Sequence, residues 1–142
     1  MNILVYSLSI SSLTVPFFPS MNACNRFGES LMHLACRRAN YDVVHYILTH
    51  GGDPCAVDDF GRTPLHDAFW RSEPRFDIVA ILLKYNPQLI QAMDVRGSLA
   101  LNYISSENWS SWCAFFFHMR EKYWPPRIIF GLPDPSELEK PL

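Results

Sequence analysis

Apolar residues recur at helical spacing in two segments of the chain, residues 41–48 and 76–83. In each segment aliphatic side chains fall at positions i, i+3 and i+4, which places them on one face of an α-helix. The pattern therefore predicts two amphipathic helices, each with one buried stripe. The stripe residues are Val43, Val44, Ile47 and Leu48 in the first helix and Ile78, Val79, Leu82 and Leu83 in the second.

The two helices belong to a unit that occurs three times. Gly28, Gly61 and Gly97 lie 33 and 36 residues apart, and each follows an Ala by five positions and an Asn or Asp by three. A period near 33 residues is typical of a stacked solenoid, in which each unit contacts only its neighbours. We therefore expect an extended binding surface rather than one globular core.

Local signals place the ends of the elements inside each unit. Ser30 and Thr63 can cap a short inner helix with their hydroxyls, and Pro64 suits the first helical position, where a missing N–H is not needed. Gly51 follows the first amphipathic helix and can end it in a left-handed conformation. The stretch around each repeated glycine predicts a turn, called a finger below. The fingers are residues 22–30, 55–63 and 91–99.

The second unit is longer than the first, and the extra residues can be placed. Ala35 to Val44 spans nine residues and Ala68 to Val79 spans eleven, so two extra residues lie in 69–75. A third lies in 84–88. Both segments contain proline and are predicted to be loops.

These features resemble the ankyrin repeat. Thr63, Pro64, Leu65 and His66 match the signature tetrapeptide of that family, and residues 51–53 are close to its Gly-Ala-Asp. The resemblance covers residues 22–118 and implies an all-α fold, a short ankyrin-repeat solenoid of helix-turn-helix units with β-turn fingers. The expected repeats are 25–57, 58–93 and 94–118. The resemblance implies a non-enzymatic protein-binding module, or scaffold, that recognises another protein through its finger tips and inner helices.

Both ends of the chain differ from the repeats. Residues 1–21 form an apolar leader that alternates in an extended pattern, and a short signal peptide is the alternative interpretation, although a basic n-region is missing. Residues 119–142 are rich in proline and predict an extended tail, anchored through Trp124 and residues 128–130. Asn108 begins a formal glycosylation sequon, but we expect it to cap a helix.

Composition narrows the class of protein. The 142 residues form one domain with 49% hydrophobic and 18% charged residues and a net charge of −2, which is typical of a globular chain. The longest basic patch is Arg37-Arg38, so we expect no nucleic-acid partner. No apolar run is long enough to span a membrane. The four cysteines form no C-x-x-C motif, so we expect reduced thiols and a cytoplasmic location. We also expect a monomer.

Candidate chemistry concentrates on two histidines. His33 and His66 occupy one column of adjacent repeats, and the third repeat has Asn102 there. A column of His, His and Asn favours a hydrogen-bonding role over a metal ligand or general base. His33 with Cys36 and His66 forms the alternative, a metal-dependent or hydrolytic enzyme. We expect no catalytic residue, no metal and no cofactor, because no base–nucleophile pair or complete ligand set follows.

The expected recognition surface consists of finger tips and the exposed side of the inner helices. Phe27 and Phe60 occupy one column before the glycine, and two interpretations remain open: paired binding anchors, or rings that stiffen the fingers. Glu29 and Arg62 are expected to form a solvated surface pair. The protein-binding candidates are Arg26, Phe27, Glu29, Arg37, Arg38, Asp59, Phe60, Arg62, Trp70, Arg71 and Arg96.

Two further expectations concern the ends of the stack. The third outer helix contains Trp109, Trp112 and residues 115–117, and we expect these rings to close the last face of the solenoid. The first finger resembles the end of an upstream repeat. A fragment or regulatory remnant of a larger ankyrin protein is therefore an alternative to a complete module.

Overall fold

The computed structural model describes residues 20–123, apart from the side chains of Glu121 and Tyr123. The described part is helical, and its only β-type pairs are two isolated bridges at the bases of the first and third fingers. The α-helices are α2 (Leu31–Arg37), α3 (Tyr41–Thr49), α4 (Pro64–Phe69), α5 (Phe76–Tyr85) and α6 (Trp109–Tyr123), and the 3-10 helices are η1 (Pro87–Gln91), η2 (Ala100–Tyr103) and η3 (Ser106–Asn108). The all-α solenoid expected from the repeat is confirmed.

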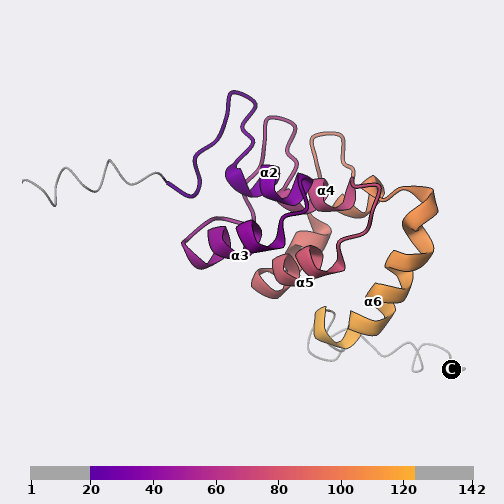
Figure 1. Ribbon diagram of the computed structural model, residues 1–142. Coiled ribbons are helices and arrows are strands. Elements are labelled where there is room, and N and C mark those ends of the chain that lie inside the picture. The colour runs from indigo at the N-terminus through magenta and orange to yellow at the C-terminus, as the bar shows by residue number, and fades with distance from the viewer. Residues whose placement is uncertain (1–19, 124–142) are drawn as a thin grey trace, which may run out of the picture.

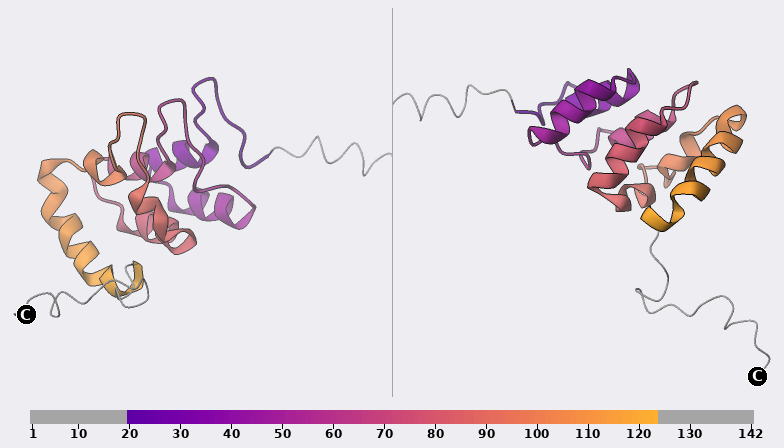
Figure 2. Two further views of the ribbon diagram at one scale, coloured as in Figure 1. Left: turned by 180° about the vertical axis from the view of Figure 1, so that it is seen from behind. Right: turned by 60° about the horizontal axis from the view of Figure 1, so that its bottom comes forward.

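The repeats stack side by side in three layers. Figure 1 shows the fingers projecting in one row, with α2 and α4 beneath them and α3 and α5 forming the next row. Figure 2 shows α6 beyond α5 at the far end of the stack. The chain therefore presents a surface formed by finger after finger and inner helix after inner helix.

Each finger is a turn closed by an Asn or Asp side chain. Oδ1 of Asp58 accepts from the backbone N–H groups of Phe60 and Arg62, both at 2.9 Å, and Asn25 and Asp94 do the same in their fingers. The repeated glycine then adopts φ values of +74° to +79°, in the left-handed region that favours glycine. Adjacent fingers are joined directly, because Asp59 N–H donates to the Phe27 carbonyl and Val95 N–H to the Phe60 carbonyl, each at 3.0 Å.

The amphipathic stripes form the core, with one exception. Val44, Ile47 and Leu48 are buried on α3, and all four predicted stripe residues are buried on α5. Val43 is exposed, so its place in the stripe was wrong. At i−1 of Val44 it lies about 100° around the helix, on the solvent side of a narrow buried face.

The longer loop of the second repeat ties that repeat to the first. Arg71 donates to the carbonyl of Arg37, and Arg75 to the carbonyl of Ala39. These carbonyls lie at and just beyond the C-terminal end of α2, where cations are favoured by the helix dipole. The inserted residues thus supply contacts between repeats.

The third repeat departs furthest from the prediction. Its inner helix is reduced to η2, a single 3-10 turn. The 3-10 helix η1 begins at Pro87, inside the predicted loop of residues 84–88, and continues to Gln91. The outer helix α6 continues to Tyr123, past residue 119 where the tail was placed. Asn108 directly precedes α6, but its side chain donates to the carbonyl of Ser72. The predictions for the leader before residue 20 and for the tail after Tyr123 lie outside the described residues.

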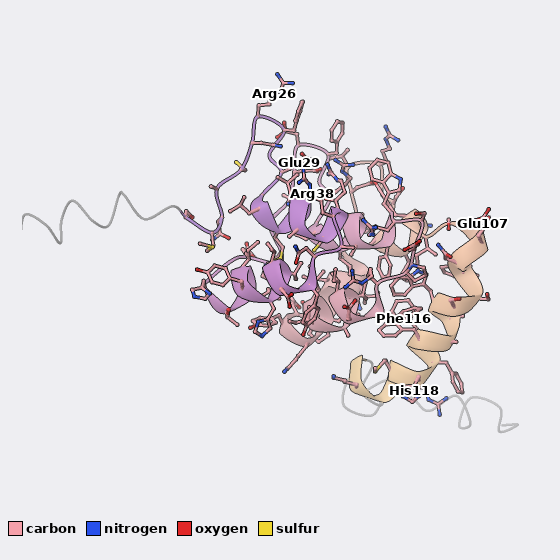
Figure 3. The ribbon with its side chains drawn as sticks, viewed as in Figure 1. Arg26, Glu29, Arg38, Glu107, Phe116 and His118 are labelled. Atoms are coloured by element: carbon pink, nitrogen blue, oxygen red, sulfur yellow. The ribbon has the colours of Figure 1, made fainter. Side chains whose placement is uncertain are left out.

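Aromatic rings close the end of the stack, as expected. Trp112 is buried and packs edge-to-face on Phe69 and on Phe76, with ring centroids 4.8 and 4.7 Å apart. Phe116 points from α6 toward the core (Figure 3). Edge-to-face aromatic pairs add to the free energy gained by burial. Within residues 20–123, these rings therefore cover the last face of the stack.

Candidate functional site

The two histidines join consecutive repeats. Nδ1 of His33 accepts from the Ser30 backbone N–H at 3.1 Å, and its Nε2 lies 2.8 Å from the carbonyl oxygen of Arg62 in the next finger. His66 repeats this, with Nδ1 accepting from the Thr63 N–H at 3.0 Å and Nε2 at 3.4 Å from the Ser98 carbonyl. The expected structural role is thereby supported by both ring nitrogens.

Thr63 is the N-cap of α4, as predicted, and it forms a capping box with His66. Its hydroxyl also lies 3.0 Å from Nδ1 of His66. The cap is therefore assembled jointly by the hydroxyl and the imidazole.

The third repeat keeps only half of the histidine arrangement. Oδ1 of Asn102 accepts from the Leu99 N–H at 2.9 Å, as Nδ1 does in His33 and His66. No fourth finger follows within residues 20–123, so the amide nitrogen of Asn102 meets no carbonyl there. Asn102 thus makes the bond to the backbone N–H at the start of its own helix but not the bond to the carbonyl of a following finger.

The arrangement gives no support to the enzyme alternative. Both ring nitrogens of His33 and His66 are occupied, and burial lowers the pKa of the His66 imidazole below its ordinary value. Cys36 is fully buried, and burial raises the pKa of its thiol, which keeps it protonated. Among residues 20–123 no three His, Cys, Asp or Glu side chains are grouped as metal ligands would be.

A buried charge network lies beneath the fingers. The guanidinium of Arg37 bonds to Glu29 and lies 3.1 Å from Oδ1 of Asp67, and Arg62 lies 2.6 Å from Oδ2 of Asp58. Arg62 also lies 3.8 Å from Glu29, which joins the two pairs. Glu29 is buried, so the expected solvated pair with Arg62 was wrong. Two guanidinium groups, those of Arg37 and Arg62, therefore share its carboxylate.

The pKa values of the carboxylates in this network are shifted in different directions. The hydrogen bond from Arg37, with one from Asn25, holds the pKa of Glu29 below its ordinary value. Burial opposes a similar drop at Asp58, but hydrogen bonds from Arg62 and from two backbone N–H groups lower its pKa overall. Burial raises the pKa of Asp67 although Arg37 opposes the shift. The network is therefore structural, and Glu29, Arg37 and Arg62 are largely committed within the protein.

Other candidates remain available on the surface. Phe27 is 47% exposed and Phe60 is 51% exposed, and Arg26 lies 4.6 Å from the Phe27 ring centroid at the tip of the first finger (Figure 3). Trp70, at the end of α4, is 58% exposed. These three rings are exposed to solvent and lie outside the buried core. Arg38, Asp59 and Arg96 are also exposed, whereas Arg71 is half-buried and bonded to the Arg37 carbonyl.

An open recess of about 530 Å³ lies between the second and third fingers and the ends of α4 and η2. Tyr103 forms part of its wall and donates to Oδ2 of Asp94 at 2.7 Å. Burial, with the hydrogen bond to Asp94, raises the pKa of the Tyr103 phenol to about 12, so it remains a neutral donor. The lining residues are Phe60, Arg62, Trp70, Asp94, Val95, Arg96, Ser98, Asn102 and Tyr103.

Sequence reasoning missed part of this site. It named Phe60, Trp70 and Arg96 but not Tyr103 or Asp94 as members of one recess. The recurrence of Asn or Asp three residues before each finger glycine could have indicated Asp94, because the side chain at that position closes the finger. Tyr103 gave no signal, since the repeated columns do not indicate its bond to Asp94.

A second hollow, of about 620 Å³, lies between α5 and α6 and is lined mainly by apolar groups, including Phe76, Phe115 and Met119. The aromatic rings at the end of the stack thus border a second candidate surface. Trp112 cannot serve as its exposed anchor, because it is buried. Trp124 lies outside the described residues.

Comparison with known proteins identifies the family. The family profile described as "Ankyrin repeats (3 copies)" matches residues 4–108. The chain belongs to the ankyrin-repeat family. Its match begins ahead of residue 22, where the repeat pattern was first recognised in the sequence. Ankyrin repeats are generally protein–protein interaction modules, and the family is typically non-enzymatic.

Three relatives illustrate how local the similarity is. The chain is 36% identical over 74 residues to ankyrin repeat protein L92 of Acanthamoeba polyphaga mimivirus, which covers 50% of the chain and 17% of that protein. It is 43% identical over 47 residues to the neurogenic locus notch homolog protein 1 of Xenopus tropicalis, which covers 33% of the chain and 2% of that protein. It is 44% identical over 41 residues to an L-asparaginase of Dirofilaria immitis, which covers 29% of the chain and 7% of that protein. The chain thus spans less than a fifth of these relatives, and no activity is carried over from them.

Within residues 20–123, no helix combines the length and apolar character needed to cross a membrane.

Proposed function

We propose that this ankyrin-repeat chain binds another protein through one face, formed by the finger tips and the ends of the inner helices. The observation that carries the proposal is the exposure of three large rings, Phe27, Phe60 and Trp70, on that face. Aromatic and arginine side chains lead the energetics of protein interfaces. Beneath the rings, the buried charge network and the backbone hydrogen bonds between adjacent fingers hold this face rigid. A rigid face loses less conformational entropy on binding.

Phe27 and Phe60 serve as anchors in this proposal. Their carbonyl groups already hold the next finger, and this backbone contact does not need the rings. Removal of both rings should therefore weaken binding while leaving the fold intact.

The test compares partner capture from the native cell by the wild type and by a Phe27→Ala, Phe60→Ala double variant. The matched control is Phe117→Ala, which removes a ring that is 69% exposed on α6, away from the fingers. We expect the double variant to lose the captured partners, the control to keep them, and all three proteins to melt at nearly the same temperature. Retention of every partner by a folded double variant would contradict the proposal.

We also propose a cytoplasmic location. Cys24, Cys55 and Cys113 are exposed free thiols. Exposed thiols are prone to mispairing in an oxidising compartment and persist in the reducing cytoplasm.

A further inference from the structure

Three aromatic side chains line the recess between the second and third fingers. Phe60, Trp70 and Tyr103 line it, and the Trp70 and Tyr103 rings meet edge-to-face with centroids 6.1 Å apart. The phenol of Tyr103 is fixed by its bond to Asp94. A volume of about 530 Å³ lies within the range of small binding pockets.

One arginine orders two of these walls. The guanidinium carbon of Arg62 lies 5.1 Å from the Phe60 ring centroid and 5.7 Å from that of Trp70. Its charge is matched by Asp58, whose carboxylate is fully buried. Because Arg62 is already paired, it supports the rings and offers little attraction to an incoming anion.

The charge left for a partner is positive. Arg96 is exposed at the rim and forms no ion pair with a described residue. The acid that lines the recess, Asp94, is buried, and its oxygens accept from Tyr103 and from the N–H groups of Arg96 and Ser98. A partner carboxylate therefore meets a guanidinium, and the lining carboxylate is shielded.

Comparison among the repeats adds a donor. The position of Asn102 is occupied by His33 and His66 in the earlier repeats, and each histidine reaches the carbonyl of the following finger. At Asn102 that following finger is absent from the described chain, and the amide group lines the recess. A backbone carbonyl of a bound partner can take the place of the missing finger.

We propose that this recess receives an aromatic side chain of the partner protein, with a carboxylate on a neighbouring residue paired to Arg96 and a backbone carbonyl bonded to Asn102. The inference rests on the protein-binding function proposed above and names the partner's chemistry. An aromatic ring fits the three ring walls, since offset and edge contacts between rings add to simple burial. The acidic residue fits Arg96, because the other cation among the lining residues, Arg62, is already paired with Asp58.

The test uses a phage-displayed library of random dodecapeptides selected on the immobilised full-length chain. We expect the enriched peptides to share an aromatic residue with Asp or Glu next to it or one position away. A synthetic peptide of the enriched sequence should bind Trp70→Ala about tenfold or more weakly, the loss typical of an anchor residue. It should bind Arg96→Ala more weakly as well, and that difference should fade at about 1 M salt, where charges are screened beyond ~3 Å.

Two sets of variants keep the result interpretable. Asn102→Asp retains the acceptor for Leu99 but removes the amide donor and adds a negative charge, so it should also weaken binding. Phe117→Ala and Arg120→Ala, matched changes on α6 at a second ring–arginine pair, should bind as the wild type does. Thermal melts of every variant verify the fold.

Each outcome decides between the inference and the function on which it rests. Enriched peptides without the aromatic–acidic pair, but dependent on Trp70, overturn the inference and leave the binding face in place. Peptides that bind Trp70→Ala and the Phe27→Ala, Phe60→Ala double variant as tightly as the wild type count against both the inference and the proposed binding face. Failure to enrich any peptide overturns the inference, while the capture experiment still decides the function.

Discussion

Arg37 and Asp67 form an ion pair between successive inner helices. Nη2 of Arg37 lies 3.1 Å from Oδ1 and 3.3 Å from Oδ2 of Asp67, and the carboxylate is fully buried. The same guanidinium bonds to Glu29 in its own repeat. One cation therefore serves two buried acids and joins the first repeat to the second. Removal of Arg37 should leave both carboxylates without this cation and lower the free energy of unfolding.

We predict that Arg37→Met destabilises the protein by about 2 kcal/mol at neutral pH. This is below the usual range for a broken buried pair, because about a third of the arginine side chain is still reached by water. Urea unfolding measures the change. The control is Arg38→Met, an exposed neighbour that should change the free energy of unfolding by less than about 0.5 kcal/mol.

The loss in Arg37→Met should shrink as the pH falls. Burial already raises the folded-state pKa of Asp67, so protonation favours its folded form, and its contribution to stability declines as the pH rises through that pKa. Without Arg37 that pKa rises further, and Glu29 loses the main cause of its lowered pKa. Unfolding curves near pH 4.5 and 7 should show the smaller difference at the lower pH. Equal losses at both would contradict the assigned network.

The sequence predicted those features of the fold that depend on local chemistry. Gly51 and the finger glycines adopt positive φ, and the stripe on α5 is buried as its spacing indicated. These outcomes follow from conformational preference and helical period, which a single segment carries. The same applies to His33, because its column showed a hydrogen-bonding requirement in three repeats.

What the sequence could not predict depends on contacts between repeats. Glu29 looks like a surface residue in its finger, and only the approach of Arg37 and Arg62 buries it. The repeat pattern also did not indicate that the third inner helix is reduced to η2. Tyr103, the last residue of η2, lines the recess and bonds to Asp94 of the third finger. Tertiary context decides such positions, and a repeat pattern describes only an average unit.

We predict that Ala39→Gly stabilises the protein. Ala39 has φ of 56°, the only positive φ at a non-glycine residue among the described residues. A left-handed conformation costs an L-residue about 1–2 kcal/mol, and glycine adds about 0.5–1 kcal/mol of backbone entropy, so the expected gain is about 0.5 kcal/mol. A rise of about 2–4 °C in the melting temperature would report it. Ala114→Gly, in the exposed part of α6, should lower the melting temperature instead.

Gly61 and Gly97 provide a matched pair of finger glycines. Their φ values are +74° and +79°, so alanine suffers the same backbone strain at either position. A Cβ at Gly61 would lie 3.0 Å from the backbone nitrogen of Val95 in the next finger, whereas nothing lies within 4 Å at Gly97.

We therefore predict that Gly61→Ala destabilises the protein more than Gly97→Ala, by at least about 1 kcal/mol. The difference corresponds to the strained bond from Val95 N–H to the Phe60 carbonyl. Chemical denaturation of both variants measures it. Equal losses would mean that adjacent fingers do not support each other.

Burial of His66 makes the junction between the second and third repeats depend on pH, and the bond from its Nε2 to the Ser98 carbonyl opposes the pKa shift without cancelling it. Burial lowers the folded-state pKa of His66, so the folded protein binds fewer protons than the unfolded chain once the pH falls below about 6.5. Stability is therefore fully present above that pH and declines as the pH falls toward the folded pKa. Protonation would also place a hydrogen on Nδ1, which now accepts from the Thr63 N–H.

We predict that His66→Asn removes this pH dependence at a cost in stability. Asparagine is the residue that the third repeat uses at the same position, and its oxygen can accept from Thr63 N–H as Asn102 accepts from Leu99. It is too short to replace Nε2, so the Ser98 carbonyl loses its partner, at a cost of about 1–3 kcal/mol near pH 7. Melting temperatures measured from about pH 7.5 to 5.5 should fall more steeply for the wild type than for the variant. Parallel slopes would show that another group carries the pH dependence, and an unchanged melting temperature at neutral pH would show that the bond to Ser98 does not join the repeats.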